Sequence, residues 1–186
     1  MIERTHLMAD PVLLTISGSL RKGSYNRMLL KHAVAAFGPA DVVEADIGIP
    51  LYNGDDEDRD GLPPAARVLV DQIKRADAIV IASPEYNKGI SGALKNAIDW
   101  VSRVPGGVLK GKPVVVMSAA AGRTGGETQM FATMSLLLQL QAQIIAGPAV
   151  LIAAAHDEFD ADGGLANELY QKAISVRMEA LRASVT

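Results

Sequence analysis

The sequence predicts an α/β fold in which one parallel β-sheet is covered by helices on both faces. Short runs of β-branched residues alternate with longer segments whose apolar residues recur at helical spacing. Five such strand–helix units, each of about 30 residues, fill the chain, and this alternation is typical of a parallel sheet. No internal repeat, low-complexity tract or linker interrupts the pattern. We therefore expect a single domain over residues 1–186.

The first strand is expected at Val12–Ser17, because its unbroken hydrophobicity indicates that both of its faces are covered. A helix follows at 26–37. Residues 41–46 alternate between polar and apolar, as expected of a strand nearer an edge, and a second helix is predicted at 65–75. The acidic run 55–60 between them is expected to be a solvated loop. The candidate buried positions of the first helix are Met28, Leu29, Ala33 and Ala36.

The second half of the chain repeats this alternation. Strands are expected at 78–83, 113–118 and 149–153, and helices at 92–103, about 126–143 and about 165–183. In open parallel sheets ligands bind outside the carboxyl ends of the strands, where the strand order reverses. The loops after the first, third and fourth strands are therefore the expected sites of chemistry.

Composition excludes several classes of site and protein. The chain has no cysteine, which rules out disulfides, thiolate catalysis and cysteine-ligated metals or clusters. The net charge of −3 provides no basic surface for nucleic acid or a membrane. The N-terminal residues have no apolar core typical of a signal peptide, and the apolar stretch 136–155 is broken by Gly147 and Pro148. We expect a cytoplasmic protein.

The loop after the first strand, Ser17–Asn26, has the residues that a phosphate monoester needs. Its glycines allow a tight turn, its hydroxyls donate hydrogen bonds, and the following helix start presents free N–H groups. Arg21 adds a charge-assisted contact. An ordinary strand-to-helix turn with Ser24 as N-cap is the alternative. A P-loop and a dinucleotide fingerprint both fail, because the glycine and lysine spacing of neither is present.

The loop after the third strand, Ser83–Gly92, is stiffened by Pro84 and opened by Gly89 and Gly92. Such a loop can aim backbone amides at a flat heteroaromatic ring. In the helix that follows, Trp100 lies away from the centre of the apolar stripe and is expected to serve packing or an interface. Lys95 and Asp99 are expected to pair on the surface. The stripe itself consists of Leu94, Ala97, Ile98 and Val101.

Together the two loops resemble those of the NADPH-dependent FMN reductase family, which includes quinone, azo-dye and chromate reductases. The similar stretches are GSLRKGSYN at 18–26, PEYNKGISGALKNAIDWVSR at 84–103 and IPLYNGDDED at 49–58. The resemblance extends over essentially the whole domain. It implies a flavodoxin-like three-layer sandwich with a five-stranded parallel sheet in the order 2-1-3-4-5.

The resemblance also assigns roles to residues. The FMN phosphate would be held by Ser19, Arg21, Ser24 and the backbone at Tyr25 and Asn26. The isoalloxazine ring would be lined by Pro84, Glu85, Tyr86, Asn87 and Gly89. The other side of the ring would be closed by Ser118 and the loop from Gly122 to Gly126. Members of the family are homodimers or homotetramers with the flavin near a subunit boundary. The loop around Tyr52 and the helix carrying Trp100 would then contribute across the interface.

Two positions depart from the family pattern. Ser91 stands where the family often has proline, which is expected to loosen that turn. Residues 119–121 are all alanine, which leaves less polar contact to the ring or the substrate.

The chemistry implied is transfer of hydride from NADPH or NADH to the flavin and then to a small electron acceptor, by a ping-pong mechanism. Backbone N–H groups of residues 119–126 are candidates to stabilise the reduced anion, and no acid–base residue is required. The histidines at 6, 32 and 156 have no metal-ligand spacing, and Ser118 has no hydrolase context.

Two other functions remain open at this point. One is a flavodoxin-type carrier of single electrons, which the modest charge, Arg21 and the 4% aromatic content disfavour. The other is a non-catalytic flavin-binding or redox-sensing protein. The physiological acceptor, the preference between NADPH and NADH, and the choice between dimer and tetramer are not determined by these residues.

Overall fold

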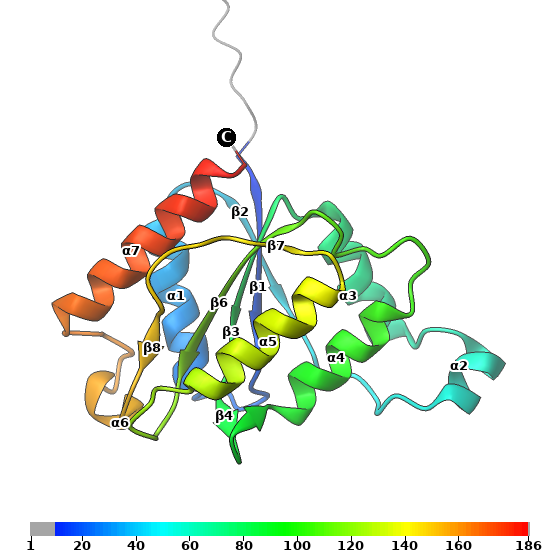
Figure 1. Ribbon diagram of the computed structural model, residues 1–186, viewed down its shortest axis with the longest axis horizontal. Helices are drawn as coiled ribbons and strands as arrows, with labels where there is room; N and C mark the ends of the chain where they lie inside the picture. Colours follow the sequence, from blue (N-terminus) through cyan, green and yellow to red (C-terminus); the bar gives the residue numbers. More distant parts are fainter. Residues whose placement is uncertain (1–9, 186) are drawn as a thin grey trace, which may run out of the picture.

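A central parallel sheet organises residues 10–185, which are the residues that the computed structural model describes (Figure 1). β1 (Val12–Ser17) lies between β2 (Asp41–Ala45) and β3 (Ala78–Ala82), and β3 is followed by β6 (Pro113–Ala119). All of these neighbours pair in parallel. The predicted order 2-1-3-4 of the first four sheet strands is therefore confirmed. The expectation about a signal peptide concerns residues that lie outside the described part of the chain.

The fifth position of the sheet is shared by two short strands, so the predicted count of five is wrong. β7 (Gln143–Ile144) pairs with the start of β6, and β8 (Leu151–Ile152) pairs with its end. Between them lies Gly147–Pro148, and Gly147 has a φ of +150°. Proline has no N–H to donate to a ladder, so the chain leaves the sheet between β7 and β8, and the strand expected at 149–153 is shortened to Leu151–Ile152.

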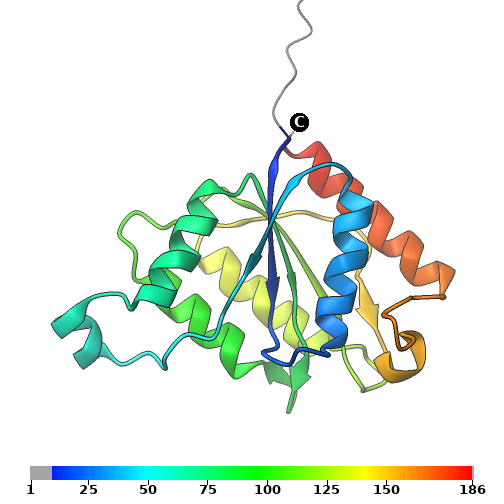
Figure 2. The same cartoon turned by 180° about the vertical axis from the view of Figure 1, so that it is seen from behind.

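Helices cover both faces of the sheet (Figures 1 and 2). α1 (Tyr25–Phe37) and α7 (Glu168–Ala183) pack on one face, while α3 (Pro64–Arg75), α4 (Gly92–Ser102) and α5 (Glu127–Gln139) pack on the other. Successive strand side chains point to opposite faces, so Leu13 joins the core under α1 and Leu14 joins the core under α3. The continuous apolar strands are thereby divided between two hydrophobic cores.

Local capping sets several helix boundaries that differ from the predicted ones. α5 ends at Gln139, because Gln141 adopts a φ of +61° and the N–H of Ala142 returns to the carbonyl of Leu137. α7 begins at Glu168, because the side chain of Asn167 caps it by accepting from the N–H of Leu169 (3.1 Å).

The acidic run at 55–60 is helical, which corrects the expectation of a loop. It forms α2 (Gly54–Asp60), capped by the side chain of Asn53. Three of its acids lie in the first turn, where the positive end of the helix dipole stabilises negative charge. None of the residues of α2 is buried, so the segment is solvated as expected. The remaining elements are a hairpin of β4 (Glu85–Tyr86) and β5 (Gly89–Ile90), and the short α6 (Ala155–Glu158).

No described helix has both the length and the hydrophobicity required to cross a membrane. The apolar stretch 136–155 is divided among the end of α5, β7 and β8.

Candidate functional site at the carboxyl edge of the sheet

Three loops meet where the central strands end. β1, β3 and β6 are adjacent and parallel, so the segments that follow them, 18–24, 83–91 and 120–126, leave the same edge of the sheet, at the bottom of Figure 1. The predicted site residues all lie in or directly beside these segments. The fold therefore brings the loops after β1, β3 and β6 together at one edge of the sheet.

The loop after β1 is a serine-lined turn that runs into α1. The hydroxyl of Ser19 accepts from the N–H of Arg21 (3.3 Å), and that of Ser24 accepts from the N–H of Asn26 (3.2 Å). Both serine side chains are buried, whereas Arg21 is exposed. Ser24 is the N-cap of α1, as the alternative interpretation required. This role leaves its hydroxyl proton free to donate.

Backbone N–H groups of this turn are free to bind an anion. Among the described residues, those of Leu20, Lys22, Gly23 and Ser24 have no hydrogen-bond partner. The start of α1 adds the N–H of Tyr25, which also has no partner among the described residues, and the partial positive charge of a helix N-terminus. A Cβ at Gly23 would meet open space, so nothing fills the turn. The residues present fit a phosphate monoester.

Asn26 connects this turn to the end of β6. Its amide nitrogen donates to the carbonyl of Ala119 (2.8 Å) and its oxygen accepts from the N–H of the same residue (2.9 Å). The side chain is 1% exposed. Both amide atoms are used in this way, and the backbone N–H of Asn26 donates to the hydroxyl of Ser24, so Asn26 serves the candidate phosphate position by fixing the start of α1. Its structural role was missed by sequence reasoning, which assigned only its backbone.

Gly18 and Ser91 hold the first and second loops in contact. A Cβ on Gly18 would lie 2.1 Å from the hydroxyl oxygen of Ser83, so only glycine fits there. The hydroxyl of Ser91 donates to the carbonyl of Gly18 (2.6 Å) and accepts from the N–H of Leu94 (3.2 Å) as the N-cap of α4. The expectation that Ser91 loosens this turn is therefore wrong, because its side chain joins two loops.

The second loop is a tight hairpin. Asn87 and Lys88 have φ values of +50° and +61°, the pattern of a type I′ turn between β4 and β5. Pro84 is buried, while Tyr86 is 51% exposed beyond it. The hairpin therefore presents a rigid backbone and one exposed aromatic ring at the site edge.

The side chain of Glu85 turns toward α5 and not toward the candidate ligand position. Its carboxylate accepts from the N–H of Gln129 (3.2 Å) and pairs with Lys88 (3.2 Å). Burial disfavours the charge of this carboxyl, but hydrogen bonds from the backbone of Gln129 and from Lys88 outweigh burial. The pKa of Glu85 consequently lies below its ordinary value of 4.5. Glu85 serves the site by fixing the start of α5.

Ser118 does not face the site edge with its side chain. It is fully buried, and its hydroxyl donates to the carbonyl of Ser83 (2.8 Å). A Cβ on Gly126, whose φ is +88°, would lie 2.1 Å from that hydroxyl oxygen. The hydroxyl of Ser118 therefore supports the end of β3, while Gly122 and Arg123 are exposed in the loop that follows β6.

A buried polar cluster behind the loops was not predicted from the sequence. The side chain of Gln129 donates to the carbonyl of Ser83 (2.9 Å), and Thr133 donates to Gln129 (3.2 Å). Both residues have no exposed surface. Their spacing of four residues places them on the same face of α5. Two polar residues on an otherwise buried helix face are the sequence pattern from which this cluster could have been predicted.

The segment after β2 is fastened to α4. Asn96 accepts from the N–H of Tyr52 (2.8 Å) and donates to the carbonyls of Ile49 and Pro50, and the indole of Trp100 donates to Pro50 (2.8 Å). Trp100 is 2% exposed, so it is a packing residue and cannot itself contact another subunit. Leu51, in contrast, is 82% exposed at the tip of this segment.

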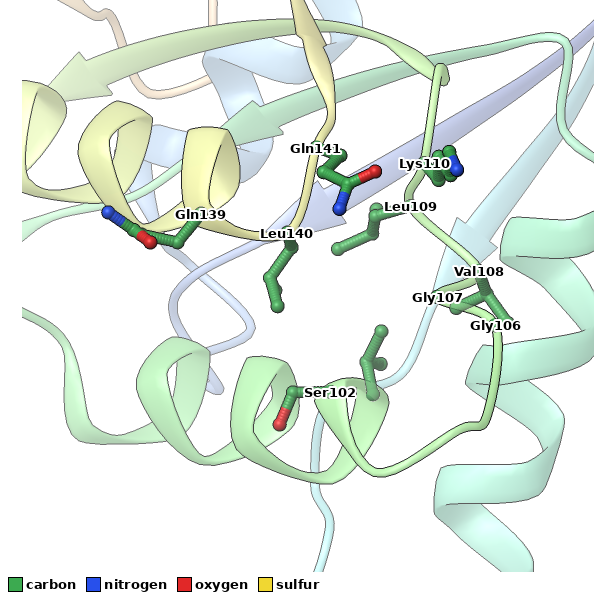
Figure 3. Close-up of a pocket in the computed structure, with 10 residues that line it drawn as sticks. Ser102, Gly106, Gly107, Val108, Leu109, Lys110, Gln139, Leu140 and Gln141 are labelled. Carbon is green, nitrogen blue, oxygen red and sulfur yellow. The ribbon is translucent and has the colours of Figure 1, made fainter.

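A separate hollow of about 320 Å³ lies away from these loops (Figure 3). It is formed by the C-terminal ends of α4 and α5 and by the segment 106–110. Because these helices run back across the sheet, their C-termini lie at its amino edge, opposite to the candidate site. Among the described residues no group of three or more His, Asp or Glu side chains could hold a metal ion.

Comparison with known proteins identifies a family. The model of the NADPH-dependent FMN reductase family matches residues 11–157. The chain is 42% identical over 178 residues to an NAD(P)H-dependent FMN reductase of Pseudomonas aeruginosa, covering 94% of this chain and 96% of the relative. It is 35% identical over 156 residues to a quinone reductase of Escherichia coli, covering 82% of each.

A solved structure agrees with these relatives. The flavoenzyme NAD(P)H:(acceptor) oxidoreductase of Paracoccus denitrificans superposes with a TM-score of 0.83 and 30% sequence identity, covering 94% of this chain and 97% of that one.

Proposed function

This chain belongs to the NADPH-dependent FMN reductase family, and we propose that it passes hydride from NAD(P)H, through non-covalently bound FMN, to quinones or similar small acceptors in a ping-pong cycle. The observation that carries the proposal is the serine-lined turn at the start of α1, with its unpaired N–H groups, locked to the end of β6 by Asn26. Bound FMN would supply two-electron chemistry, accepting hydride and passing it on.

The phosphate of FMN would be held by the first loop. Ser19 and Ser24 would donate from buried hydroxyls, and the N–H of Tyr25 would donate from the start of α1, where Asn26 holds the cap. Arg21 is exposed and free to close over the phosphate from outside as a charge-assisted donor.

The ring of FMN would lie against the second and third loops. The hairpin at 84–89 offers backbone groups held in place by its type I′ turn. Within residues 119–126, the N–H groups of residues 121–124 and of Gly126 have no partner among the described residues and would donate to the ring edge where negative charge develops. Fixed donors of this kind need no rearrangement during the reaction, which is why a rigid hairpin and a glycine-rich loop suit the task.

The exposed ring of Tyr86 beside this edge suits a flat acceptor that stacks on the flavin. Quinone reduction is the named activity of the relative from Escherichia coli, and the open side of the site favours small planar acceptors here too. We also propose a cytoplasmic location, where NAD(P)H is available as the donor.

A homodimer or homotetramer is part of the proposal. Leu51 is 82% exposed, and the outward face of α5 carries Phe131 at 55% and Leu138 at 58%. Contacts of such apolar side chains with a second copy would remove them from water. Light scattering coupled to gel filtration would measure the mass, and a monomer at micromolar concentration would contradict this part.

Anaerobic reduction tests the function. The protein would be reconstituted with FMN, and its visible spectrum recorded while NADPH is added. We expect rapid bleaching directly to the two-electron-reduced form, followed by recovery when a quinone is added. Bound FMN that NADPH does not reduce, or that accumulates a stable one-electron form, would indicate a carrier or sensor. Failure to bind FMN would refute the assignment of the loops.

A further inference from the structure

A groove of about 480 Å³ lies between α1 and the edge strand β2. These two elements are drawn in blue and cyan in Figure 2. This volume falls within the range of about 300 to 1,000 Å³ that small-molecule sites occupy. Lys22, which lines the groove, belongs to the same turn that we assign to the FMN phosphate. The groove is therefore continuous with the candidate site but is not part of it.

The groove is positively charged in a protein whose net charge is −3. Lys22, Arg27 and Lys31 line it against one carboxylate, Glu44, which leaves a local charge of +2. Arg27 forms an ion pair with Glu44 across the groove. Neither lysine has a carboxylate partner within residues 10–185. Two cations are thus available to an anionic ligand.

Between these charges the lining is apolar. Met28 and Val34 reach the groove from α1, and Val42, which is 42% exposed, reaches it from β2. An apolar floor with cations at the rim suits a ligand that combines a flat heterocycle with phosphate groups. A nucleic acid would need a longer basic track with many phosphate contacts, whereas this groove offers room for one nucleotide.

We propose that the groove binds the adenosine 2′-phosphate end of NADPH, with Lys31 contacting the 2′-phosphate, Lys22 contacting the 5′-phosphate, and Val34 and Val42 lying against the adenine. This inference rests on the proposed function, and it adds a preference for NADPH over NADH. The 2′-phosphate is the only group that distinguishes the two donors, and it is a dianion near neutral pH. A lysine that lacks a protein partner gains most from such a charge.

Nucleotide binding tests the groove without relying on turnover. The dissociation constants of adenosine 2′,5′-bisphosphate and of 5′-AMP would be measured by calorimetry on the FMN-loaded protein. Lys31→Glu is the diagnostic variant, because Lys31 is exposed and lies outside the phosphate turn. Lys172→Glu is the matched control, since it makes the same change of charge at an exposed position of α7. Lys31→Arg should retain binding.

We expect Lys31→Glu to weaken the bisphosphate at least about tenfold, the equivalent of about 1.4 kcal/mol. The variant should leave 5′-AMP, the affinity for FMN and the KM for NADH unchanged, and it should raise the KM for NADPH in proportion. Equal effects of Lys31→Glu and Lys172→Glu, or no effect of either, would place the adenosine end elsewhere. That result is distinct from failure of the proposed function, in which NADPH does not bleach the flavin of the unaltered protein.

Discussion

Replacing Asn26 with leucine should destabilise the protein and loosen FMN, because it removes the link between α1 and β6. The side chain is 1% exposed and bonds to both backbone groups of Ala119, which is itself 2% exposed. Leucine has a similar shape and admits no water in place of the amide. Two buried backbone groups would then lack partners at about 1 to 3 kcal/mol each, so the free energy of unfolding should fall by about 2 to 6 kcal/mol. A domain has only about 5 to 15 kcal/mol in total.

Urea denaturation followed by circular dichroism would measure this loss, with an unchanged m-value showing that the folded state stays compact. The affinity for FMN, followed by quenching of flavin fluorescence, should fall in parallel. Asn167→Leu is the control, because it removes the cap hydrogen bond of α7 and a bond to Glu158 while leaving the bonds between Asn26 and Ala119 in place. It should cost about 1 kcal/mol and leave FMN binding unchanged.

Asn26→Asp tests separately whether the side chain at position 26 must donate a hydrogen bond to the carbonyl of Ala119. An ionised carboxylate can accept from the N–H of Ala119 but cannot donate to its carbonyl, whereas a protonated carboxyl does both. This variant should therefore recover stability relative to the unaltered protein as the pH falls toward 4. A loss below about 1 kcal/mol in Asn26→Leu, within the range of a single exposed bond, would refute the reasoning. So would a normal FMN affinity.

Three further predictions concern the neighbouring loops. Ser91→Ala removes the bond to the Gly18 carbonyl and the cap of α4, so thermal and urea unfolding should show a loss of about 1 to 2 kcal/mol, and weaker FMN binding should accompany it. The pKa of Glu85 is lower in the folded protein than its ordinary value of 4.5, so the ionised carboxylate stabilises the fold above pH 4.5, and this stability is lost as the pH falls through the folded pKa. Glu85→Gln should therefore be less stable than the unaltered protein at pH 7. In acid the two proteins should become equally stable, as urea titrations at a series of pH values would show. Trp100→Phe removes one of the two side-chain donors to the Pro50 carbonyl and leaves Asn96 as the other, so unfolding should be easier by about 1 kcal/mol, and equal stability of the two proteins would argue against the hydrogen bond.

Local patterns predicted most of the regular elements. Strands β1, β3 and β6 are short apolar runs, and hydrophobic periodicity locates such runs well because burial depends on neighbours a few residues away. The stripe of Leu94, Ala97, Ile98 and Val101 is buried as its spacing predicts, and Lys95 pairs with Asp99 (2.6 Å). The misjudged elements were α2, where an acidic run is helical through its cap and dipole, and the divided fifth strand at Gly147–Pro148.

The sequence by itself determined the class of fold, the family and the loops that form the candidate site, because strand periodicity, turn residues and motif spacing are local properties of the chain. Only the tertiary structure decided what each polar side chain of those loops does. Asn26 bonds to a residue 93 positions away and Ser91 to one 73 positions away, and Ser118 turns inward to the carbonyl of Ser83. A hydroxyl or amide has the same appearance in a motif whether it meets a ligand or a buried carbonyl. The choice is made when distant segments pack, since each buried backbone group must then find its partner.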